Sequence, residues 1–374
     1  MTRSPVIGID GSRLTICERT GTETYSFQLL RAVAEIKTKE QLRVYLNATT
    51  APQVGLDSFD YVEMPFPRLW THVRLSWEMA RRPPGVLFVP SHVVPLWHPP
   101  SVVTVHDLGY LCEPEAHPPN QRRMLDWTTR WSCRTATKII AISHTTKRDL
   151  IAHYHVPESK IRVIHHGISR TFSRASPAEV YRVRNAYDLP DRFVLFVGTV
   201  QPRKNIARIA EAVSRLASAG LPHKLVVAGK FGWLGEHFER DLETFDRPEL
   251  VHRLGYIPEG DLTALYSGAD AFCFPSLYEG FGLPVLEAMA CEVPVVTSNR
   301  GSLPEIAGEA ALLVDPTSVD QIASALIRVL TDNTERFRLI DGGKQRVRDF
   351  SWSKTAVETL RLLIEVRDQS QRAK

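Results

Sequence analysis

Short, almost purely apolar runs alternate with longer amphipathic stretches along the whole chain. Such runs are typical of parallel strands that helices cover on both faces of the sheet. In the first half, the pattern predicts strands at residues 6–11, 42–47, 85–90, 101–107, 138–143 and 161–167. In the second half, it predicts strands at residues 192–199, 224–229, 250–255, 271–276, 293–298 and 310–316.

Helical stretches separate many of these strands. Residues 205–220, NIARIAEAVSRLASAG, repeat apolar side chains at helical spacing and end at a glycine. Repeated strand–helix alternation predicts a doubly wound α/β fold. The polar, irregular residues 169–190 separate the halves, so we expect two Rossmann-like domains, at residues 1–170 and 171–350, facing across a cleft. Residues 351–374 read as an amphipathic C-terminal helix.

Composition agrees with two ordinary globular domains. The 374 residues are 43% hydrophobic and 24% charged, with a net charge of +4. This weak positive charge suits a sugar nucleotide, a phospholipid surface or a nucleic acid equally well. Because the charge is not concentrated in a run and no helix-turn-helix signal stands out, we expect no nucleic acid partner.

Cysteine usage and the N-terminal residues indicate the compartment. Five scattered cysteines never form a C-x-x-C pair and are expected to be buried thiols in a reducing environment: Cys17, Cys112, Cys133, Cys273 and Cys291. Residues 1–7 lack the apolar segment of a signal peptide, and no run reaches the roughly 18 apolar residues of a membrane span. We expect a cytoplasmic protein, with peripheral contact at the inner face of a membrane left open.

The stretch PSLYEGFGLPVLEAMACEVPVVTS, residues 275–298, places two carboxylates eight positions apart around a Gly-x-Gly turn. Gly280 and Gly282 allow close approach of a ligand to the backbone, and a helix N-terminus that follows them can bind phosphate. Glu287, about one turn into this helix, suits the vicinal diol of a ribose, and Glu279 on the loop suits a hexose hydroxyl. Alternatively, the acidic residue only compensates the helix dipole, and a lone Gly-x-Gly is a weak signal.

A second candidate lies in RFVLFVGTVQPRKN, residues 192–205. The strand ends at Gly198, and Arg203 and Lys204 stand just before a helix. A planar guanidinium beside a compact ammonium suits a diphosphate. A solvated basic pair is the alternative, but cations at a helix N-terminus oppose its dipole and need an anion to be favourable.

These segments, together with LGYIP and PVVTSNRGSLPEIAG, resemble the family 4 retaining glycosyltransferases of the GT-B fold, through the motifs G-x4-R-K-N and E-x7-E. The resemblance covers nearly the whole chain. It implies that Arg203 and Lys204 hold the donor diphosphate, that Glu279 contacts sugar hydroxyls and that Glu287 binds the ribose. It implies further donor contacts, largely through the backbone, from Gly198, Tyr256, Ile257, Gly280, Phe281, Gly282 and Leu283. The chain departs from the family at Glu292, where glycine is common.

The first half carries two further candidates. The resemblance places Gly21, in a turn before a helix, near the donor phosphate, although a turn followed by a helix is also ordinary in this fold. His106 ends a predicted strand, and the resemblance implies that it hydrogen-bonds the donor sugar; a purely structural histidine is the alternative. The other histidines lack carboxylate or cysteine partners at ligand spacing and are expected to be structural.

Two stretches combine arginine with tryptophan on predicted helices, at residues 68–82 and 119–138. Such a surface suits anionic lipid headgroups or the phosphate of a lipid-linked acceptor. Packed tryptophans beside solvated arginines are the alternative, and the sequence leaves both open.

The resemblance implies transfer of a hexose from a nucleoside-diphosphate sugar, GDP-mannose or a UDP-sugar, to a glycan or lipid-linked acceptor. It also implies retention of configuration by front-face attack, and a C-terminal helix that packs back on the first domain. No Asp-x-Asp pair follows a predicted strand, so we expect no metal requirement and no other cofactor. A non-catalytic sugar-nucleotide-binding subunit and a nucleotide-sugar epimerase are the alternatives.

Overall fold

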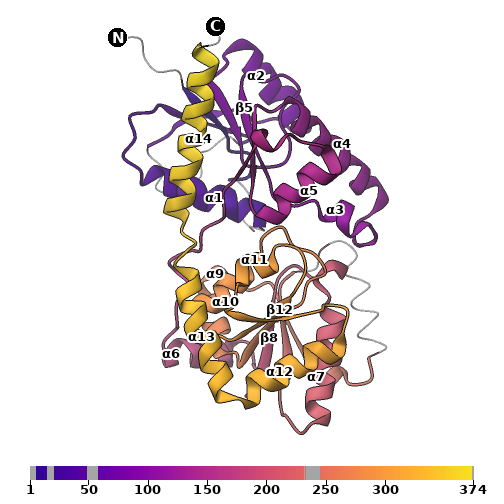
Figure 1. Ribbon diagram of the computed structural model, residues 1–374. Helices are drawn as coiled ribbons and strands as arrows, with labels where there is room; N and C mark the ends of the chain where they lie inside the picture. Colours follow the sequence, from indigo (N-terminus) through magenta and orange to yellow (C-terminus); the bar gives the residue numbers. More distant parts are fainter. Residues whose placement is uncertain (1–5, 15–20, 49–57, 231, 233–244, 373–374) are drawn as a thin grey trace. The chain divides into compact units, whose positions relative to one another are not determined.

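The computed structural model describes residues 6–14, 21–48, 58–230, 232 and 245–372. The chain divides into two compact units (Figure 1). Unit 1 comprises Met1–Leu108, Arg123–Gly167 and Ser351–Lys374, and unit 2 comprises Gly109–Arg122 and Ile168–Phe350.

Unit 1 is built on a seven-stranded parallel sheet in the order β3-β2-β1-β4-β5-β6-β7. The strands are β1 (Ile7–Asp10), β2 (Leu42–Leu46), β3 (Asp60–Glu63), β4 (Val86–Val89), β5 (Ser101–Val105), β6 (Lys138–Ala141) and β7 (Ile161–Val163). In the central register, Ile9 of β1 pairs with Val44 of β2 on one side and with Phe88 of β4 on the other. The sequence missed β3, because this edge strand has no buried side chain and therefore no apolar run.

Helices cover this sheet. They are α1 (Gly21–Ala34), α2 (Ser76–Arg81), the greater part of α4 (Pro119–Thr135), α5 (His144–Tyr154) and α14 (Trp352–Arg372), with short turns η1 (Thr71–Leu75) and η3 (Glu158–Lys160). The C-terminal helix α14 packs against α1 and against β4. Tyr25 and Leu29 of α1 and Leu363 and Val366 of α14 share one buried core with the central strands.

Unit 2 contains a six-stranded parallel sheet in the order β10-β9-β8-β11-β12-β13. The strands are β8 (Phe193–Val197), β9 (Lys224–Ala228), β10 (Val251–Gly255), β11 (Ala271–Phe274), β12 (Val295–Ser298) and β13 (Ala311–Val314). The helices and short turns are α3 (Gly109–Cys112), η2 (Pro114–Ala116), α6 (Pro177–Ala186), η4 (Pro202–Lys204), α7 (Ile206–Ser218), η5 (Pro248–Leu250), α9 (Glu259–Gly268), α10 (Leu283–Ala290), α11 (Leu303–Ala307), α12 (Val319–Thr331) and α13 (Asn333–Val347).

The helices of unit 2 bury one apolar side each. On α7, Ile206, Ile209, Val213 and Leu216 are buried at spacings of three or four, and this helix packs against α12. Helix α10 packs against α13 and α9. The predicted doubly wound α/β fold is confirmed, because both sheets are parallel and helices connect many of their successive strands.

Two smaller expectations can be compared with the structure. Cys133, Cys273 and Cys291 are buried free thiols, Cys112 is partly buried, and Cys17 lies outside the described residues. Within the part of the chain that the structure describes, no helix is both long and apolar enough to cross a bilayer.

Candidate active site

The strand order of unit 2 reverses between β8 and β11, and the loops that follow these two strands meet there. In parallel α/β sheets such a switch point at the carboxyl ends of the strands is where ligands bind. Lys204 Nζ lies 2.7 Å from Glu279 Oε1, and Arg203 NH1 lies 3.1 Å from the same oxygen. All three side chains are buried. The structure therefore brings together three side chains that the sequence analysis had selected on separate motifs.

This cluster leaves one positive charge in excess. Burial alone would raise the pKa of Glu279, but the charges of Arg203 and Lys204 outweigh it and lower the pKa below its usual value. The carboxylate is therefore ionised at neutral pH. Within the described residues, Glu279 supplies an anion for both cations. Lys204 also lies 4.7 Å from the ring centre of Phe274, a cation–π contact.

Asn205, which the sequence analysis did not select, holds the two loops together. Its backbone is left-handed, with φ 63° and ψ 31°, at the start of α7. Its side-chain amide donates to the carbonyls of Pro275 at 2.9 Å and Pro316 at 2.6 Å. Leu277 N–H donates to the carbonyl of Arg203 at 2.9 Å. An asparagine directly after Arg-Lys was the available signal, because asparagine tolerates this backbone conformation better than most residues.

Gly282, in the turn before α10, lies where a side chain would be strained and crowded. Gly282 has φ 105°, and a Cβ there would lie 2.6 Å from the Leu303 side chain. Its N–H and that of Leu283, at the helix start, donate to no residue in the described part of the chain. These two amides and the helix dipole are suited to an anion.

A second loop fixes the backbone on which Glu279 stands. Ser302 Oγ donates to the carbonyls of Glu279 at 3.0 Å and Phe281 at 2.8 Å. Gly301 has φ 62°, and a Cβ there would lie 2.8 Å from the carbonyl oxygen of Glu279 and 2.9 Å from its nitrogen. The roles of Gly301 and Ser302 were not predicted from the sequence. Gly-Ser before a short helix was the only local sign.

Glu287 lies in α10 and is partly buried. The hydroxyl of Tyr266 donates to its Oε2 at 2.8 Å. Burial raises the pKa of Glu287 to about 7, although the hydrogen bond from Tyr266 lowers it. The carboxyl group is therefore poised to change its charge near neutral pH. No described residue donates a hydrogen bond to Oε1.

The other donor-binding predictions in unit 2 differ in exposure. Tyr256, just after β10, is exposed, and Lys230 Nζ lies 5.7 Å from the centre of its ring. The side chain of Ile257 is buried, so only its backbone is available to a ligand. Gly198 ends β8, and its N–H already donates to the carbonyl of Ala228 at 2.9 Å. Gly280 is buried in the loop between Glu279 and Gly282.

In unit 1, His106 follows β5 and is buried among aromatic rings. Its ring centre lies 4.9 Å from Tyr25, 5.5 Å from His92 and 5.7 Å from His166. Its Nε2 lies 2.8 Å from the carbonyl of Pro90, which fixes a neutral tautomer with a proton on that nitrogen. Burial is the main cause that lowers the pKa of His106 to about 4, so the imidazole is neutral at physiological pH.

Gly21, the remaining prediction in unit 1, is the exposed first residue of α1. A Cβ there would meet nothing within 4 Å. The preceding residues 15–20 lie outside the described part of the chain. The roles that the family resemblance gives to Gly21 and His106 stay predictions.

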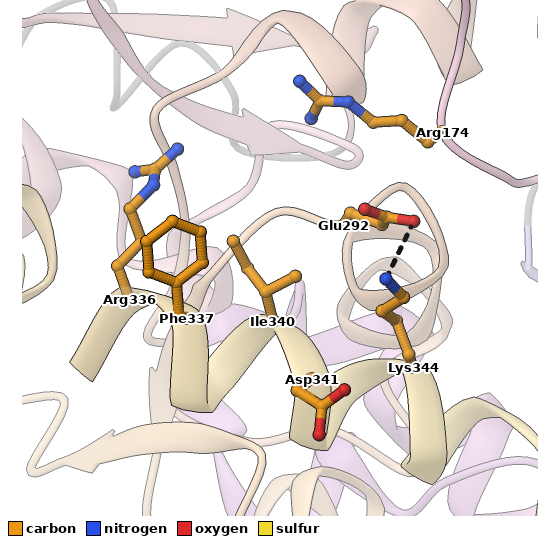
Figure 2. Close-up of a pocket in the computed structure, with 7 residues that line it drawn as sticks. All are labelled: Arg174, Glu292, Arg336, Phe337, Ile340, Asp341 and Lys344. Carbon is orange, nitrogen blue, oxygen red and sulfur yellow. Dashed lines mark ion pairs between the residues drawn. The ribbon is translucent and has the colours of Figure 1, made fainter. Parts of the chain in front are cut away.

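A pocket of about 480 Å³ lies elsewhere in unit 2 and contains none of the predicted site residues (Figure 2). Glu292 lines it beyond the C-terminal end of α10 and pairs with Lys344 of α13 at 3.3 Å. The backbone of Glu292 has φ 60°. This conformation favours glycine, which explains why glycine is common here in the family that the sequence resembles.

Comparison with known proteins agrees with this geometry. The family model of group 1 glycosyl transferases matches residues 178–346, and that of glycosyltransferase family 4 matches residues 21–172. The chain is 30% identical over 361 residues to O-antigen chain mannosyltransferase B of Escherichia coli, which covers 91% of this chain and 95% of that protein.

Solved structures share the fold at low sequence identity. Sucrose-phosphate synthase from Thermosynechococcus elongatus has a TM-score of 0.76 at 20% identity and covers 96% of this chain and 98% of its own. Alr3699/HepE of Anabaena, in complex with UDP-glucose, has a TM-score of 0.73 at 16% identity, covering 95% and 99%. With two family models covering most of its length and a relative matched nearly end to end, the chain belongs to glycosyltransferase family 4 and is a glycosyltransferase of the GT-B fold.

Proposed function

We propose that this glycosyltransferase moves a mannosyl group from GDP-mannose to a glycan or lipid-linked acceptor, with retention of configuration and without a metal ion. The observation that carries the proposal is the buried cluster of Arg203, Lys204 and Glu279 beside the amides that open α10. Two cations beside the N–H groups of Gly282 and Leu283, which donate to no described residue, suit a pyrophosphate.

The chemical step needs stabilisation of a departing diphosphate. The bond between sugar C1 and the β-phosphate oxygen breaks, and its electron pair stays on the phosphate. Arg203 and Lys204 face this growing charge from a buried site, where preorganised cations act more strongly than in water. The acceptor oxygen bonds to C1 on the face that the phosphate leaves, and its proton passes to the phosphate oxygen. This front-face route, which needs no protein nucleophile, follows the family resemblance.

Glu287 and Glu279 hold the two ends of the donor in this proposal. The Oε1 atom of Glu287, together with the oxygen that Tyr266 already contacts, accepts hydrogen bonds from the ribose diol. Glu279 is kept ionised by its two cationic neighbours and accepts from sugar hydroxyls. The neutral imidazole of His106 in unit 1 is likewise suited to hydroxyl groups rather than to phosphate.

The choice of GDP-mannose rests on the similarity to an O-antigen chain mannosyltransferase. A UDP-sugar is the competing donor, because a protein of the same fold has been solved with UDP-glucose. A thermal-shift panel of GDP-mannose, UDP-glucose and UDP-N-acetylglucosamine separates these, since a ligand that binds only the folded chain raises its Tm. A shift with UDP-glucose and none with GDP-mannose would overturn the sugar assignment and leave the diphosphate site intact.

Transfer itself is tested by incubating the chain with the donor that binds and with mannose oligosaccharides or a lipid-linked mannoside. Proton NMR of the product reports its anomeric configuration, and inversion contradicts the front-face route. A parallel reaction in excess EDTA tests the metal requirement. If EDTA abolishes activity and Mn²⁺ restores it, the enzyme requires a metal ion and this part of the proposal is wrong.

The same reactions address both alternatives. Conversion of the donor into an epimer without any acceptor would identify an epimerase. Tight donor binding with neither transfer nor slow donor hydrolysis would identify a non-catalytic binding subunit. The buried Arg203, Lys204 and Glu279 suit the transferase, because cations at the diphosphate stabilise its charge as it leaves.

A further inference from the structure

Large apolar side chains are exposed together on one part of unit 1. They come from the segment around η1 and α2, from the loop after β4 and from α4. We call this surface the tryptophan face and define it by Leu69, Val73, Trp77, Trp97, Met124 and Trp127. The exposed fractions of its three tryptophans are 59% for Trp77, 66% for Trp97 and 56% for Trp127. Soluble proteins rarely group side chains of this size at the surface without a partner.

Contacts within unit 1 join the three segments into one surface. The ring of His72 in η1 lies 6.4 Å from the ring of Trp127 in α4. The N–H of Trp97 lies 3.4 Å from Ser76 Oγ at the start of α2. The N–H of Val94, in the same loop as Trp97, donates to Ser132 of α4 at 3.1 Å. Figure 1 draws both α2 and α4 to the right of α14.

Helix α4 exposes two of its large apolar side chains, whereas two others, Leu125 and Trp131, are partly buried. The side chains it buries are small or weakly polar: Thr128, Thr129, Ser132 and Cys133. Met124 and Trp127 are exposed instead. The usual amphipathic helix does the opposite, because burying large apolar side chains contributes most to stability.

The exposed tryptophans of the face differ from their buried neighbour Trp70. Trp70, in the same stretch as Trp77, is only 5% exposed, and its ring N–H donates to the carbonyl of Met64 at 2.8 Å. Trp70 therefore has the structural role that the sequence analysis allowed for these tryptophans. Trp77 instead carries Arg81 over its exposed ring, at 5.5 Å.

The charges around the tryptophan face are in positive excess. Its acidic residues are already paired, Glu78 with Arg74 at 3.1 Å and Asp126 with Arg130 at 3.4 Å. In the described ranges, six further arginines of these segments have no ion-pair partner: Arg68, Arg81, Arg82, Arg122, Arg123 and Arg134. A second copy of this chain is a poor partner for such a face, because a twofold contact would bring two sets of arginines together.

We propose that unit 1 binds the surface of an anionic phospholipid membrane through the tryptophan face. Tryptophan rings settle at the level of lipid headgroups, where one part of the ring is apolar and the N–H stays hydrated. Arginine side chains extend from an apolar surface to lipid phosphates, and each cation near the membrane adds attraction. The contact is peripheral. It stands independently of the donor and acceptor proposed above.

Sedimentation of the full-length chain with vesicles tests this surface. Vesicles of phosphatidylcholine alone are compared with vesicles containing one third phosphatidylglycerol, at low and high salt. We expect binding to the anionic vesicles that weakens with salt, because exposed charges are screened. The double variant Trp77→Gln with Trp127→Gln should weaken binding by about tenfold or more. Its control is Tyr181→Gln with Phe337→Gln, which removes aromatics that are 68% and 67% exposed in unit 2.

Charge reversal gives a second, independent variant. Arg81→Glu with Arg123→Glu should weaken binding by about tenfold or more, whereas Arg348→Glu with Arg361→Glu, two exposed arginines elsewhere, should leave it nearly unchanged. Circular dichroism and Tm check that each variant is folded. Equal binding to neutral and anionic vesicles, or equal losses in face and control variants, overturns the proposal. Light scattering that shows a dimer lost in the tryptophan variant would assign the face to a second copy instead.

Discussion

Unit 1 and unit 2 share one architecture but carry different polar groups at the carboxyl edges of their sheets. In both, the strand order reverses beside the first strand, between β1 and β4 in unit 1 and between β8 and β11 in unit 2. Unit 2 presents a charged cluster there, formed by Arg203, Lys204 and Glu279. Unit 1 presents neutral imidazoles, because burial lowers the pKa values of His92 and His106. Its charged side chains nearby include the buried Asp10, whose pKa burial raises, and the ion pair of Arg13 with Glu23, which adds no net charge.

This difference shows what the shared fold leaves undecided. A doubly wound sheet provides loops at its carboxyl edge, and the side chains on those loops determine which ligand chemistry is favourable. A cationic, buried edge suits a diphosphate, whereas uncharged rings that pack on one another suit hydroxyl groups. The four experiments below contrast the two edges, from the largest expected effect to the smallest.

Removal of the cation at the charged edge should have the largest effect. We expect Lys204→Ala to lower kcat by about 100- to 1000-fold, because its ammonium faces charge that develops only in the transition state. The matched control is Lys224→Ala, an exposed lysine of β9, which should leave kcat unchanged. The measurement is release of nucleoside diphosphate from the donor sugar nucleotide. Equal rates for both variants would mean that the charged edge of unit 2 does not stabilise the leaving group.

The buried imidazole of His106, at the carboxyl edge of the sheet in unit 1, should make the stability of the fold sensitive to acid. The pKa of His106 is about 4 when folded, against about 6.5 when unfolded, so acid protonates the unfolded chain first. Stability is therefore full above pH 6.5 and falls as the pH decreases toward 4. The unfolding free energy of the wild type should fall when the pH is lowered from 7 to 4.5. In His106→Gln this fall should be smaller by about 2–3 kcal/mol. Denaturant titrations at both pH values measure this difference, with the exposed His153→Gln as control. An unchanged pH dependence in His106→Gln would show that this imidazole does not titrate as its burial requires.

Rigidity of the charged edge is tested at Gly301. A Cβ there would press on the backbone of Glu279, so Gly301→Ala should displace this loop. We expect about 1–3 kcal/mol of lost stability together with a kcat reduced about tenfold. Gly220→Ala is the control, because Gly220 also has positive φ, 82°, but faces open space. Both variants carry backbone strain, so both should have a lower Tm. Only Gly301→Ala should also have a lower kcat, measured at a temperature where both variants are folded.

Glu287 should give the smallest effect, visible in the pH dependence of binding. Its pKa of about 7 means that the carboxylate is mostly protonated at pH 6 and mostly ionised at pH 8. If ribose hydroxyls donate to the ionised form, donor affinity should rise by up to about tenfold over this range. Calorimetry with a nucleotide sugar, whose diphosphate does not titrate there, measures it. Glu287→Gln should flatten the dependence, and the exposed Glu309→Gln should retain it. A rise that persists in Glu287→Gln would assign the titration to another group.

Much of the fold was predictable because strands and helices leave local patterns. The buried strands of both sheets appear as apolar runs, and α7 and α10 begin within two residues of their expected starts. The edge strand β3 was not predicted, since its side chains are all at least partly exposed. The prediction that α10 opens with a glycine turn was equally local, because Gly282 and Pro284 suit the conformations required there.

The candidate site was predictable only in its separate parts. Arg203, Lys204 and Glu279 were selected from two motifs, but their common hydrogen-bonded cluster joins residues 75 positions apart. The supporting contacts from Asn205 and Ser302 were missed because each acts through backbone carbonyls of another loop. The tyrosine that contacts Glu287 was also missed, since Tyr266 lies on a different helix with no motif of its own.

The sequence by itself determined which segments form strands and helices, and which residue types stand at the strand ends, because both depend on neighbours along the chain. Only the tertiary structure decided the pairing of Glu279 with Lys204, the neutrality of His106 and the exposure of Trp77 beside the burial of Trp70. Each of these depends on the dielectric surroundings and contacts that distant segments create when the sheets assemble. The order of the residues identifies the side chains, but the distances between them are set only when the chain folds.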